Sequence, residues 1–157
     1  GSLLMAEILH PDQGIVNVTN PEMAYTYRSS ALKRGELSGV ILGARFALQQ
    51  STAEQVKATM AEFTARRKQT QPPGASLGSM FKNPPNDYAG RLIEASGLKG
   101  KRIGGVMVSP QHANFFVNDE QATASDYRQL VELVQKTVAS KQGVKLELEI
   151  EFIGDWN

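Results

Sequence analysis

The residues from 144 to 152 alternate strictly between apolar and charged side chains. Because successive side chains of a β-strand point to opposite faces, this period of two predicts a strand with one face against a core. The three carboxylates of Glu147, Glu149 and Glu151 would share the other, solvated face. No other segment restricts the local conformation as strongly. We therefore predict that 144–152 is a strand whose apolar face is covered by another layer of the fold.

A helix is predicted immediately before this strand. Thr123 and Asp126 have the spacing of a helix cap, and Gly143 stands where a helix usually ends. Between them one apolar stripe recurs at helical spacing, formed by Tyr127, Leu130, Val131, Val134 and Val138. We therefore expect a helix over 124–141 packed on a sheet that contains 144–152, which is an α+β arrangement.

The first part of the chain reads as three strands and a helix. Strands are predicted over 3–9, 15–19 and 40–48, the first two joined by a turn at residues 10–14. Three strands with an open edge are typical of a piece of a larger sheet, and unpaired edges readily pair with another chain. We expect this edge to be covered by a neighbouring chain or a swapped segment, that is, by self-association.

Ser51 and Glu54 have capping-box spacing, and apolar residues then recur so that 52–68 is predicted to be an amphipathic helix. The sequence Gln71-Pro72-Pro73-Gly74 ends it and marks a boundary. We therefore divide the chain into 1–70 and 71–157. In the second part we expect a short helix closed by Gly97, and strands at 106–108 and 114–118.

Composition excludes several classes of function. The chain has 17 basic and 16 acidic residues, which gives no general case for nucleic acid or a membrane surface as a partner. No apolar run approaches the ~20 residues that span a bilayer. The absence of cysteine excludes disulfides and thiolate metal sites and fits the cytoplasm. The two histidines, His10 and His112, lack metal-like spacing, so no metal is expected.

Chemically active side chains are densest between Gly74 and Pro85. Small residues there allow a ligand to approach the backbone, Ser79 could donate a proton, and Lys82 and Asn83 could bind an anionic or amide group. The alternative is an ordinary loop between two units. The pattern matches neither the nucleophile elbow nor a phosphate-binding Walker loop.

Four further residues have a functional and a structural interpretation. Arg28, beside two tyrosines, could clamp a carboxylate or simply pack on a ring. Glu149 could be one of three equivalent solvated carboxylates, and His112 could bind a polar ligand or satisfy local hydrogen bonds. Arg67 belongs to a basic cluster that is either a solvated helix end or an anion site.

Beyond these patterns, ordered motifs resemble the UDP-N-acetylenolpyruvoylglucosamine reductase family. The resemblance extends over nearly the whole chain. Its segments are Tyr27-Arg28-Ser29-Ser30, Gly78-Ser79-Met80-Phe81-Lys82-Asn83-Pro84, Ala89-Gly90-Arg91-Leu92-Ile93, Gly97-Leu98-Lys99-Gly100, Ile103-Gly104-Gly105, Val108-Ser109, His112-Ala113-Asn114-Phe115, Val117-Asn118, Leu146-Glu147-Leu148-Glu149-Ile150 and Phe152-Ile153-Gly154.

The resemblance implies that 71–157 is the carboxyl-terminal substrate-binding domain and that 1–70 is a remnant of the FAD-binding domain. It implies a cytoplasmic oxidoreductase of peptidoglycan precursor synthesis, and hence of cell wall biogenesis, cell shape and division. In the family reaction, NADPH reduces FAD, and hydride then passes to UDP-N-acetylglucosamine enolpyruvate, giving UDP-N-acetylmuramate. The alternative is a nucleotide-sugar binding module with no activity of its own.

By this resemblance Ser79 is the proton donor, and Arg28 and Glu149 lie against the substrate carboxylate and polarise it. A second carboxylate there makes sense if Glu149 is protonated or shares a proton. Asn83 and His112 fall where the family contacts the substrate. Arg67 falls near a flavin-contacting arginine.

Three departures from the family pattern affect what we expect. The glycine-rich flavin segments are missing, so we expect this chain by itself to lack FAD and activity. Thr70 stands where some members have a lysine for the substrate diphosphate. Only Pro85-Asn86-Asp87 separates Pro84 from Tyr88, which indicates a short-form member without the insert that carries a substrate-covering tyrosine.

Overall fold

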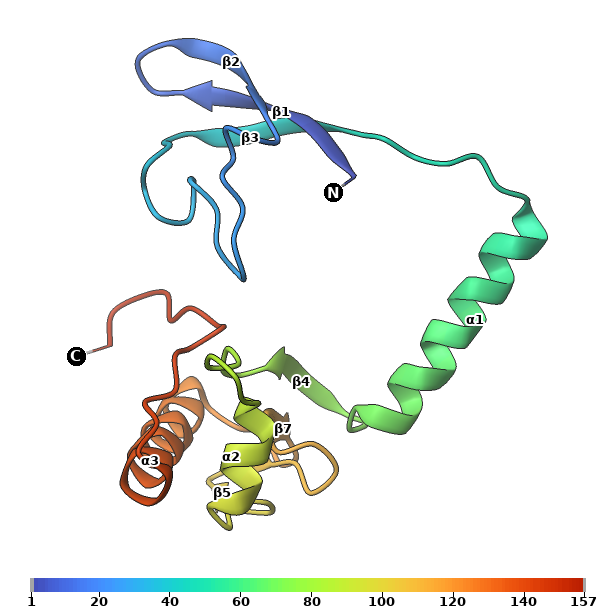
Figure 1. The fold of residues 1–157 in the computed structure, drawn as a ribbon. Coiled ribbons are helices and arrows are strands. Elements are labelled where there is room, and N and C mark those ends of the chain that lie inside the picture. The colour runs from blue at the N-terminus through green and yellow to red at the C-terminus, as the bar shows by residue number, and fades with distance from the viewer. Residues whose placement is uncertain (1, 157) are drawn as a thin grey trace. The chain divides into compact units, whose positions relative to one another are not determined.

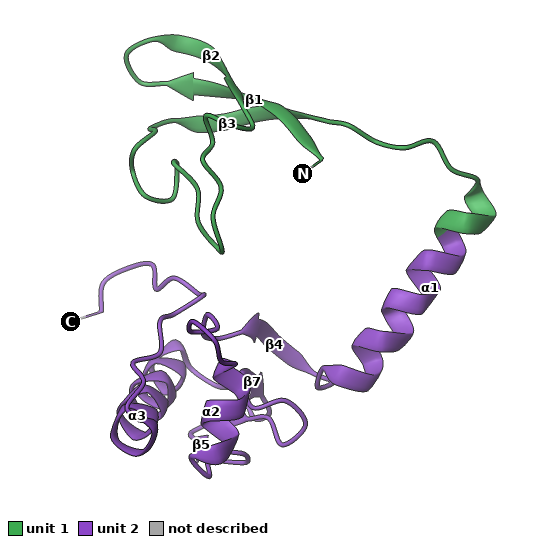
Figure 2. Ribbon diagram, viewed as in Figure 1, with its two compact units in different colours: residues 1–56 green, residues 57–157 purple. Residues whose placement is uncertain are grey.

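The computed structural model describes residues 2–156, which form two compact units of residues 1–56 and 57–157 (Figure 2). The division between the units falls within helix α1 (Ala53–Thr70), whereas the sequence pattern predicts a boundary after this helix. The assignment of 1–70 to an FAD-binding domain and of 71–157 to a substrate-binding domain stays a prediction.

The first unit is a three-stranded antiparallel sheet. Strands β1 (Leu3–His10), β2 (Gly14–Thr19) and β3 (Val40–Phe46) lie in the order β2-β1-β3 (Figure 1). The predicted hairpin and the three predicted strands are thereby confirmed, with β3 ending two residues early. A small core of Ala6, Ile8, Val18 and Met23 holds the sheet and the following turns together. The outer edges belong to β2 and β3, and their covering by another chain stays a prediction.

One glycine is required where β3 approaches β1. Gly39 has a φ of 141° and precedes β3 directly. A Cβ atom at this position would lie 2.5 Å from a methyl carbon of Ile8 and 2.6 Å from the carbonyl oxygen of Leu9. The chain can therefore enter the sheet beside the buried Ile8 only without a side chain at position 39.

Helix α1 is confirmed, but no residue of its predicted apolar face is buried, and its cap lies one residue later than predicted. Thr52 Oγ1 accepts a hydrogen bond from Gln55 N at 3.2 Å, and Gln55 Oε1 accepts one from Thr52 N at 3.4 Å. The sequence offers two overlapping capping boxes, and the structure uses Thr52 with Gln55 rather than Ser51 with Glu54. The apolar side chains of Val56, Met60 and Phe63 stay largely exposed within the described residues.

The second unit contains the greater part of α1 and combines an antiparallel sheet with two further helices (Figure 1). Its sheet has the order β4-β7-β6-β5, and helix α3 packs against β5, β6 and helix α2. The elements are β4 (Ala75–Ser79), α2 (Ala89–Ala95), β5 (Arg102–Ile103), β6 (Val106–Val108), β7 (Phe115–Asn118) and α3 (Ala124–Gln142). Mixed helix and strand confirm the α+β class. Because residues 75–79 form strand β4, the alternative interpretation of 74–85 as a loop over its whole length is wrong.

The predicted helix and its apolar stripe are confirmed as α3. Thr123 and Asp126 form a reciprocal capping box, and Gly143 ends the helix in the left-handed region with a φ of 69°. Four stripe residues are fully buried, while Tyr127 is partly buried. They join residues of α2, β6 and β7 in the main core of this unit.

The predicted strand over 144–152 is wrong, although burial alternates as predicted except at the half-buried Glu149. Leu146 is 1% exposed and its charged neighbours point outward, but only one β-bridge forms, between Phe81 and Leu148. Two backbone hydrogen bonds flank this bridge, Lys82 N to Glu147 O at 2.8 Å and Glu149 N to Met80 O at 2.9 Å.

Proline explains why the pairing stops on the side of residues 144 and 145. The partner segment runs into Pro84 and Pro85, which have no backbone N–H to donate. On its other side, this segment is already bonded to Asn114. The residues from 144 to 152 therefore bury their apolar side chains without a strand to pair with along their length, and α3 packs on a sheet that does not contain them.

Candidate functional site

A cavity of about 430 Å³ in the second unit gathers the polar side chains. Ser79, Asn83 and His112, three of the predicted site residues, line it together. The other lining residues are Tyr88, Gly90, Arg91, Glu94, Gln111, Ala113 and Asn114. They come from the end of β4, from α2 and from the loop before β7, so segments far apart in sequence meet here.

Ser79 is placed by an irregularity in β4. The pairing of β4 with β7 shifts register between Ser76 and Ser79, where Ser79 pairs with Phe115. Gly78 lies within this shift with a φ of 81°, a conformation that glycine adopts without the steric cost other residues meet. Bulges of this kind redirect the side chains that follow them. The bulge thus sets the direction of the half-buried Ser79 side chain.

Asn83 connects the serine segment to helix α2. Its Oδ1 accepts a hydrogen bond from Ala89 N at 3.0 Å, at the first residue of the helix. Tyr88, at the cap position, makes no cap bond with its own side chain. Asn83 therefore caps α2 from a distance of six residues, and part of its hydrogen-bonding capacity serves the fold.

His112 is held in one orientation by its surroundings. Its Nδ1 accepts a hydrogen bond from Asn114 N at 3.3 Å, so Nε2 is the ring nitrogen that can donate. The ring meets Phe115 edge-on, with centroids 4.8 Å apart. Gly90 lets the ring lie against α2, because a Cβ atom there would come within 3.3 Å of His112 Cε1. His112 can therefore offer a hydrogen-bond donor to a ligand.

The charged groups around this cavity are paired locally. Arg91 forms an ion pair with Asp87, and Glu94 forms one with Lys99 at 2.7 Å. The hydrogen bonds from the Arg91 guanidinium and from Tyr88 N lower the pKa of Asp87 to about 2, and Asp87 in turn raises the pKa of Arg91. The rim of the cavity is therefore close to neutral.

Glu149 lies on the opposite side of the segment that follows Ser79. Its backbone N–H donates to Met80 O, and its side chain is half-buried and is not part of the cavity lining. The neighbouring Glu147 is exposed and pairs with Lys82 at 3.3 Å. The carboxylates at 147 and 149 therefore have different surroundings.

Arg28 belongs to the first unit, at the tip of a tight turn. Thr26 and Ser29 exchange two backbone hydrogen bonds of 3.1 and 3.2 Å across it. Arg28 has a φ of 54°, which is unusual for a residue with a long side chain. Its guanidinium lies 5.8 Å from the centre of the Tyr27 ring. Such backbone strain costs ~1–3 kcal/mol and often accompanies function.

Arg67 lies in the last turns of α1 and is exposed. Its Nε donates to Gln71 Oε1 at 3.2 Å. Thr70 donates its hydroxyl to Arg66 O at 2.9 Å within the helix. This end of α1 is tied to the loop of the cavity, because Gln111 Nε2 donates to Gln69 O at 2.9 Å.

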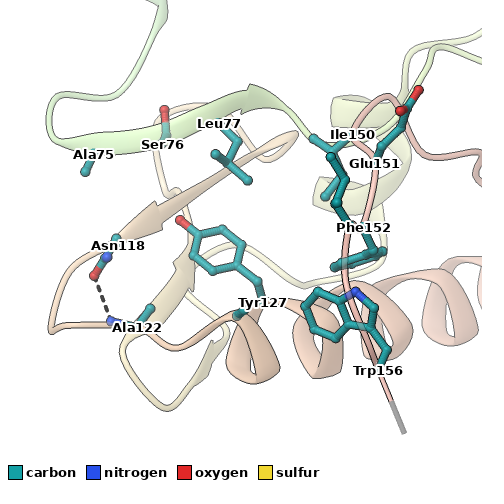
Figure 3. Close-up of a pocket in the computed structure, with 12 residues that line it drawn as sticks. Ala75, Ser76, Leu77, Asn118, Ala122, Tyr127, Ile150, Glu151, Phe152 and Trp156 are labelled. Atoms are coloured by element: carbon teal, nitrogen blue, oxygen red, sulfur yellow. Dashed lines mark hydrogen bonds between the residues drawn. The ribbon is translucent and has the colours of Figure 1, made fainter.

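A second, apolar cavity of about 420 Å³ was not foreseen from the sequence. Figure 3 shows Leu77 and Tyr127 on one side of it and Ile150, Phe152 and Trp156 on the other. Tyr127 donates its hydroxyl to Phe116 O at 3.3 Å, and burial raises the pKa of this phenol. The sequence signal for this cavity is the set of apolar positions in 144–152, whose alternation predicts the core of a sheet instead.

The polar cavity can bind a ligand through neutral donors and acceptors and can supply a hydroxyl proton from Ser79. Within residues 2–156 no cluster of three or more His, Cys, Asp or Glu side chains could hold a metal ion. None of the described helices is long and apolar enough to cross a bilayer.

These features define an α+β unit with a polar cavity beside a bulged strand. A family model for the carboxyl-terminal domain of UDP-N-acetylenolpyruvoylglucosamine reductase matches residues 68–153. The chain therefore belongs to the UDP-N-acetylenolpyruvoylglucosamine reductase family.

Individual relatives agree with this assignment. UDP-N-acetylenolpyruvoylglucosamine reductase 2 of Bacillus anthracis is 45% identical over 98% of the chain and 50% of its own length. The reductase of Chloroflexus aggregans is 48% identical over 84% of the chain and 46% of its own length. The crystal structure of the Thermus caldophilus reductase superposes with a TM-score of 0.79 at 39% identity, over 96% of the chain and 52% of that protein. The chain thus spans about half the length of these relatives.

Proposed function

We propose that this chain forms the substrate-reducing half of an FAD-dependent, NADPH-driven reductase that converts UDP-N-acetylglucosamine enolpyruvate to UDP-N-acetylmuramate in the cytoplasm. The observation that carries the proposal is the meeting of Ser79, Asn83 and His112 in one cavity. These are residues of the motifs by which the chain resembles the family. The names of its relatives support the same reaction.

The chemistry requires a proton donor beside a site that stabilises negative charge. Bound FAD supplies the hydride. Addition of hydride to the enolpyruvyl double bond places negative charge on the adjacent carbon and its carboxylate, which must be protonated and stabilised. In the proposal, the Ser79 hydroxyl gives the proton, and Arg28 and Glu149 polarise the carboxylate. His112 Nε2 and Asn83 hold the substrate.

One residue of this chain suits a contact to the flavin cofactor. Arg67 is exposed, and its hydrogen bond to Gln71 uses Nε rather than the terminal nitrogens. The terminal nitrogens of a guanidinium are suited to bidentate contacts with anionic or carbonyl oxygens. The family resemblance implies that Arg67 contacts FAD, and this exposure is compatible with that role.

Ser79→Ala in the full-length reductase tests the proposal. The change removes the proton donor, so reoxidation of the reduced flavin by the enolpyruvyl sugar should slow by ~10²–10⁴-fold. Reduction of the flavin by NADPH should stay near normal. Stopped-flow absorbance measures the two half-reactions separately. A variant that reduces its flavin slowly but is reoxidised normally would contradict the role of Ser79.

Arg28 and Glu149 are tested by the same two measurements. Changing Arg28 should slow reoxidation and also weaken substrate binding, because its carboxylate contact exists before and during hydride transfer. Glu149→Gln should slow reoxidation, whereas Glu147→Gln is the matched control and should do little, since Glu147 is exposed and pairs with Lys82. Equal effects at 147 and 149 would remove Glu149 from the site. A full-length protein that binds the UDP-sugar without NADPH-dependent turnover would support a binding module instead.

A further inference from the structure

Asn114 is one of the few buried polar side chains in the described chain and lies next to the candidate proton donor. It is 3% exposed and immediately precedes β7. Its Oδ1 accepts from Phe81 N at 3.0 Å, and its Nδ2 donates to Phe81 O at 2.8 Å. Its backbone carbonyl accepts from Met80 N at 2.8 Å. One residue thus makes three hydrogen bonds to the two residues that follow Ser79.

The opposite edge of the same short segment is bonded to the region of Glu149. Glu149 N donates to Met80 O and Lys82 N donates to Glu147 O, at 2.9 and 2.8 Å. The segment from Met80 to Lys82 is therefore held between Asn114 on one side and the glutamate segment on the other. Ser79 is joined to it by a single peptide bond.

The side chain of Asn114 continues the backbone hydrogen bonding beyond the point where strand pairing ends. The register of β4 against β7 shifts before Ser79, and Ser79 with Phe115 is the last pair of this ladder. Beyond it, the Asn114 amide offers Phe81 one acceptor and one donor, as a neighbouring strand would. An aliphatic side chain would leave the buried N–H and C=O of Phe81 without these partners, so the segment would have to shift.

We infer that Asn114 is a positioning residue that fixes the Ser79 hydroxyl relative to Glu149 for the protonation step. This inference rests on the proposed function and deepens it. Asn114 acts by holding the backbone at Phe81, and its side-chain oxygen and nitrogen are both used for that purpose. A reacting group displaced by about 1 Å can lose ~10²-fold in rate.

Two substitutions separate the amide's hydrogen bonds from its size. Asn114→Leu removes both side-chain bonds to Phe81. Asn114→Asp keeps the shape and, when ionised, keeps the acceptor but loses the donor. The matched control is Asn118→Leu, because Asn118 lies at the far end of β7, opposite Ala75, and its Oδ1 accepts from Ala122 N at 2.9 Å (Figure 3).

In the full-length reductase, Asn114→Leu should slow flavin reoxidation by the enolpyruvyl sugar by ~10–100-fold. Flavin reduction by NADPH should be unchanged, and the dissociation constant of the substrate should change by less than about three-fold. Asn114→Asp should slow the same step, and Asn118→Leu should leave it unchanged. Should Asn114→Leu fail to fold, the Asp variant decides. A second readout, independent of turnover, is amide hydrogen exchange at Phe81, which should accelerate in Asn114→Leu, where the acceptor of the Phe81 N–H is lost, and stay unchanged in Asn118→Leu.

A double-mutant cycle distinguishes positioning of Ser79 from a general structural role. In a Ser79→Ala background, an Asn114 substitution should slow reoxidation by less than about three-fold further. The same slowing with and without Ser79, equal slowing of both half-reactions, or normal reoxidation in the Asn114 variants would overturn the inference. Normal reoxidation in Ser79→Ala alone would instead overturn the proposed function, so the two failures are told apart.

Discussion

Unusual conformation or ionisation occurs at several candidate site positions, as it does elsewhere in this chain. Gly78 has a positive φ directly before Ser79, and Arg28 has one at the tip of its turn. The carboxylate of Asp87 is held by Arg91 on the rim of the cavity. Backbone strain and altered pKa values are both typical of functional sites. At Gly78 and Arg28 the unusual backbone conformation coincides with a family motif.

The Asp87–Arg91 pair predicts a pH dependence. Its hydrogen bonds lower the pKa of Asp87 from 3.8 to about 2. A lowered pKa means that the pair stabilises the folded state fully above pH ~4, and that this stabilisation is lost as the pH falls toward 2. NMR titration of the carboxyl carbon should therefore give a midpoint of about 2.

Arg91→Ala should raise this midpoint toward 3.8, because the largest cause of the shift is removed while the Tyr88 N–H remains. Arg128→Ala, which breaks the exposed pair with Glu132 on α3, is the control and should leave Asp87 unchanged. An Asp87 midpoint near 3.8 in the unmodified chain would contradict the pairing.

Elements differ in how far their ends are fixed by local signals. Helix α3 begins at a reciprocal capping box and ends at Gly143, so both ends are encoded nearby. Strand β4 is set by its partner β7, by the bulge at Gly78 and by the segment after Ser79. The unit that holds the cavity therefore combines a helix whose ends are set by neighbouring residues with a strand whose geometry depends on distant residues.

The cap of α3 should be measurable as stability. Thr123→Ala removes the hydroxyl that accepts from Asp126 N at 3.1 Å, and it should lower the free energy of unfolding by ~1 kcal/mol. Thr123→Ser keeps an equivalent oxygen, so it should change the free energy of unfolding by at most a few tenths of the loss expected for Thr123→Ala. Urea denaturation of the chain compares the three proteins. Equal losses for Ala and Ser would show that the hydroxyl does not contribute.

At the scale of the whole molecule, the two units have cores of very different size. The first unit has the small core around Ile8, whereas the second buries Phe81, Phe116, Leu130 and many neighbours. Hydrophobic burial is the main favourable term in folding. The second unit, which holds the cavity, is therefore the more stable scaffold.

Hydrogen exchange should resolve the two units. Backbone amides of β6, β7 and α3 should exchange about ten-fold or more slowly than those of β1 and β3, as for an opening free energy larger by ~1.4 kcal/mol. Val134→Ala opens the larger core and should accelerate exchange in the second unit alone. Equal acceleration in both units would mean that they unfold as one.

The sequence by itself determined α3, the N-terminal hairpin and the family. Helical hydrogen bonds join residues four apart, so the stripe from Tyr127 to Val138 and its cap are sufficient to specify the helix. A tight hairpin is also local, and β1 and β2 pair as the turn between them predicts. The motif around Ser79 is contiguous, which is why it can be read without a structure.

The tertiary structure decided the pairing of 144–152, the direction of Ser79 and the grouping of the cavity residues. Alternation indicates which side chains are buried, but a strand also needs a partner backbone, and here one bridge forms at Phe81, with two prolines opposite residues 144 and 145. Ser79 and His112 meet only because β4 pairs with β7. Contacts between distant segments depend on packing, and no local pattern encodes them.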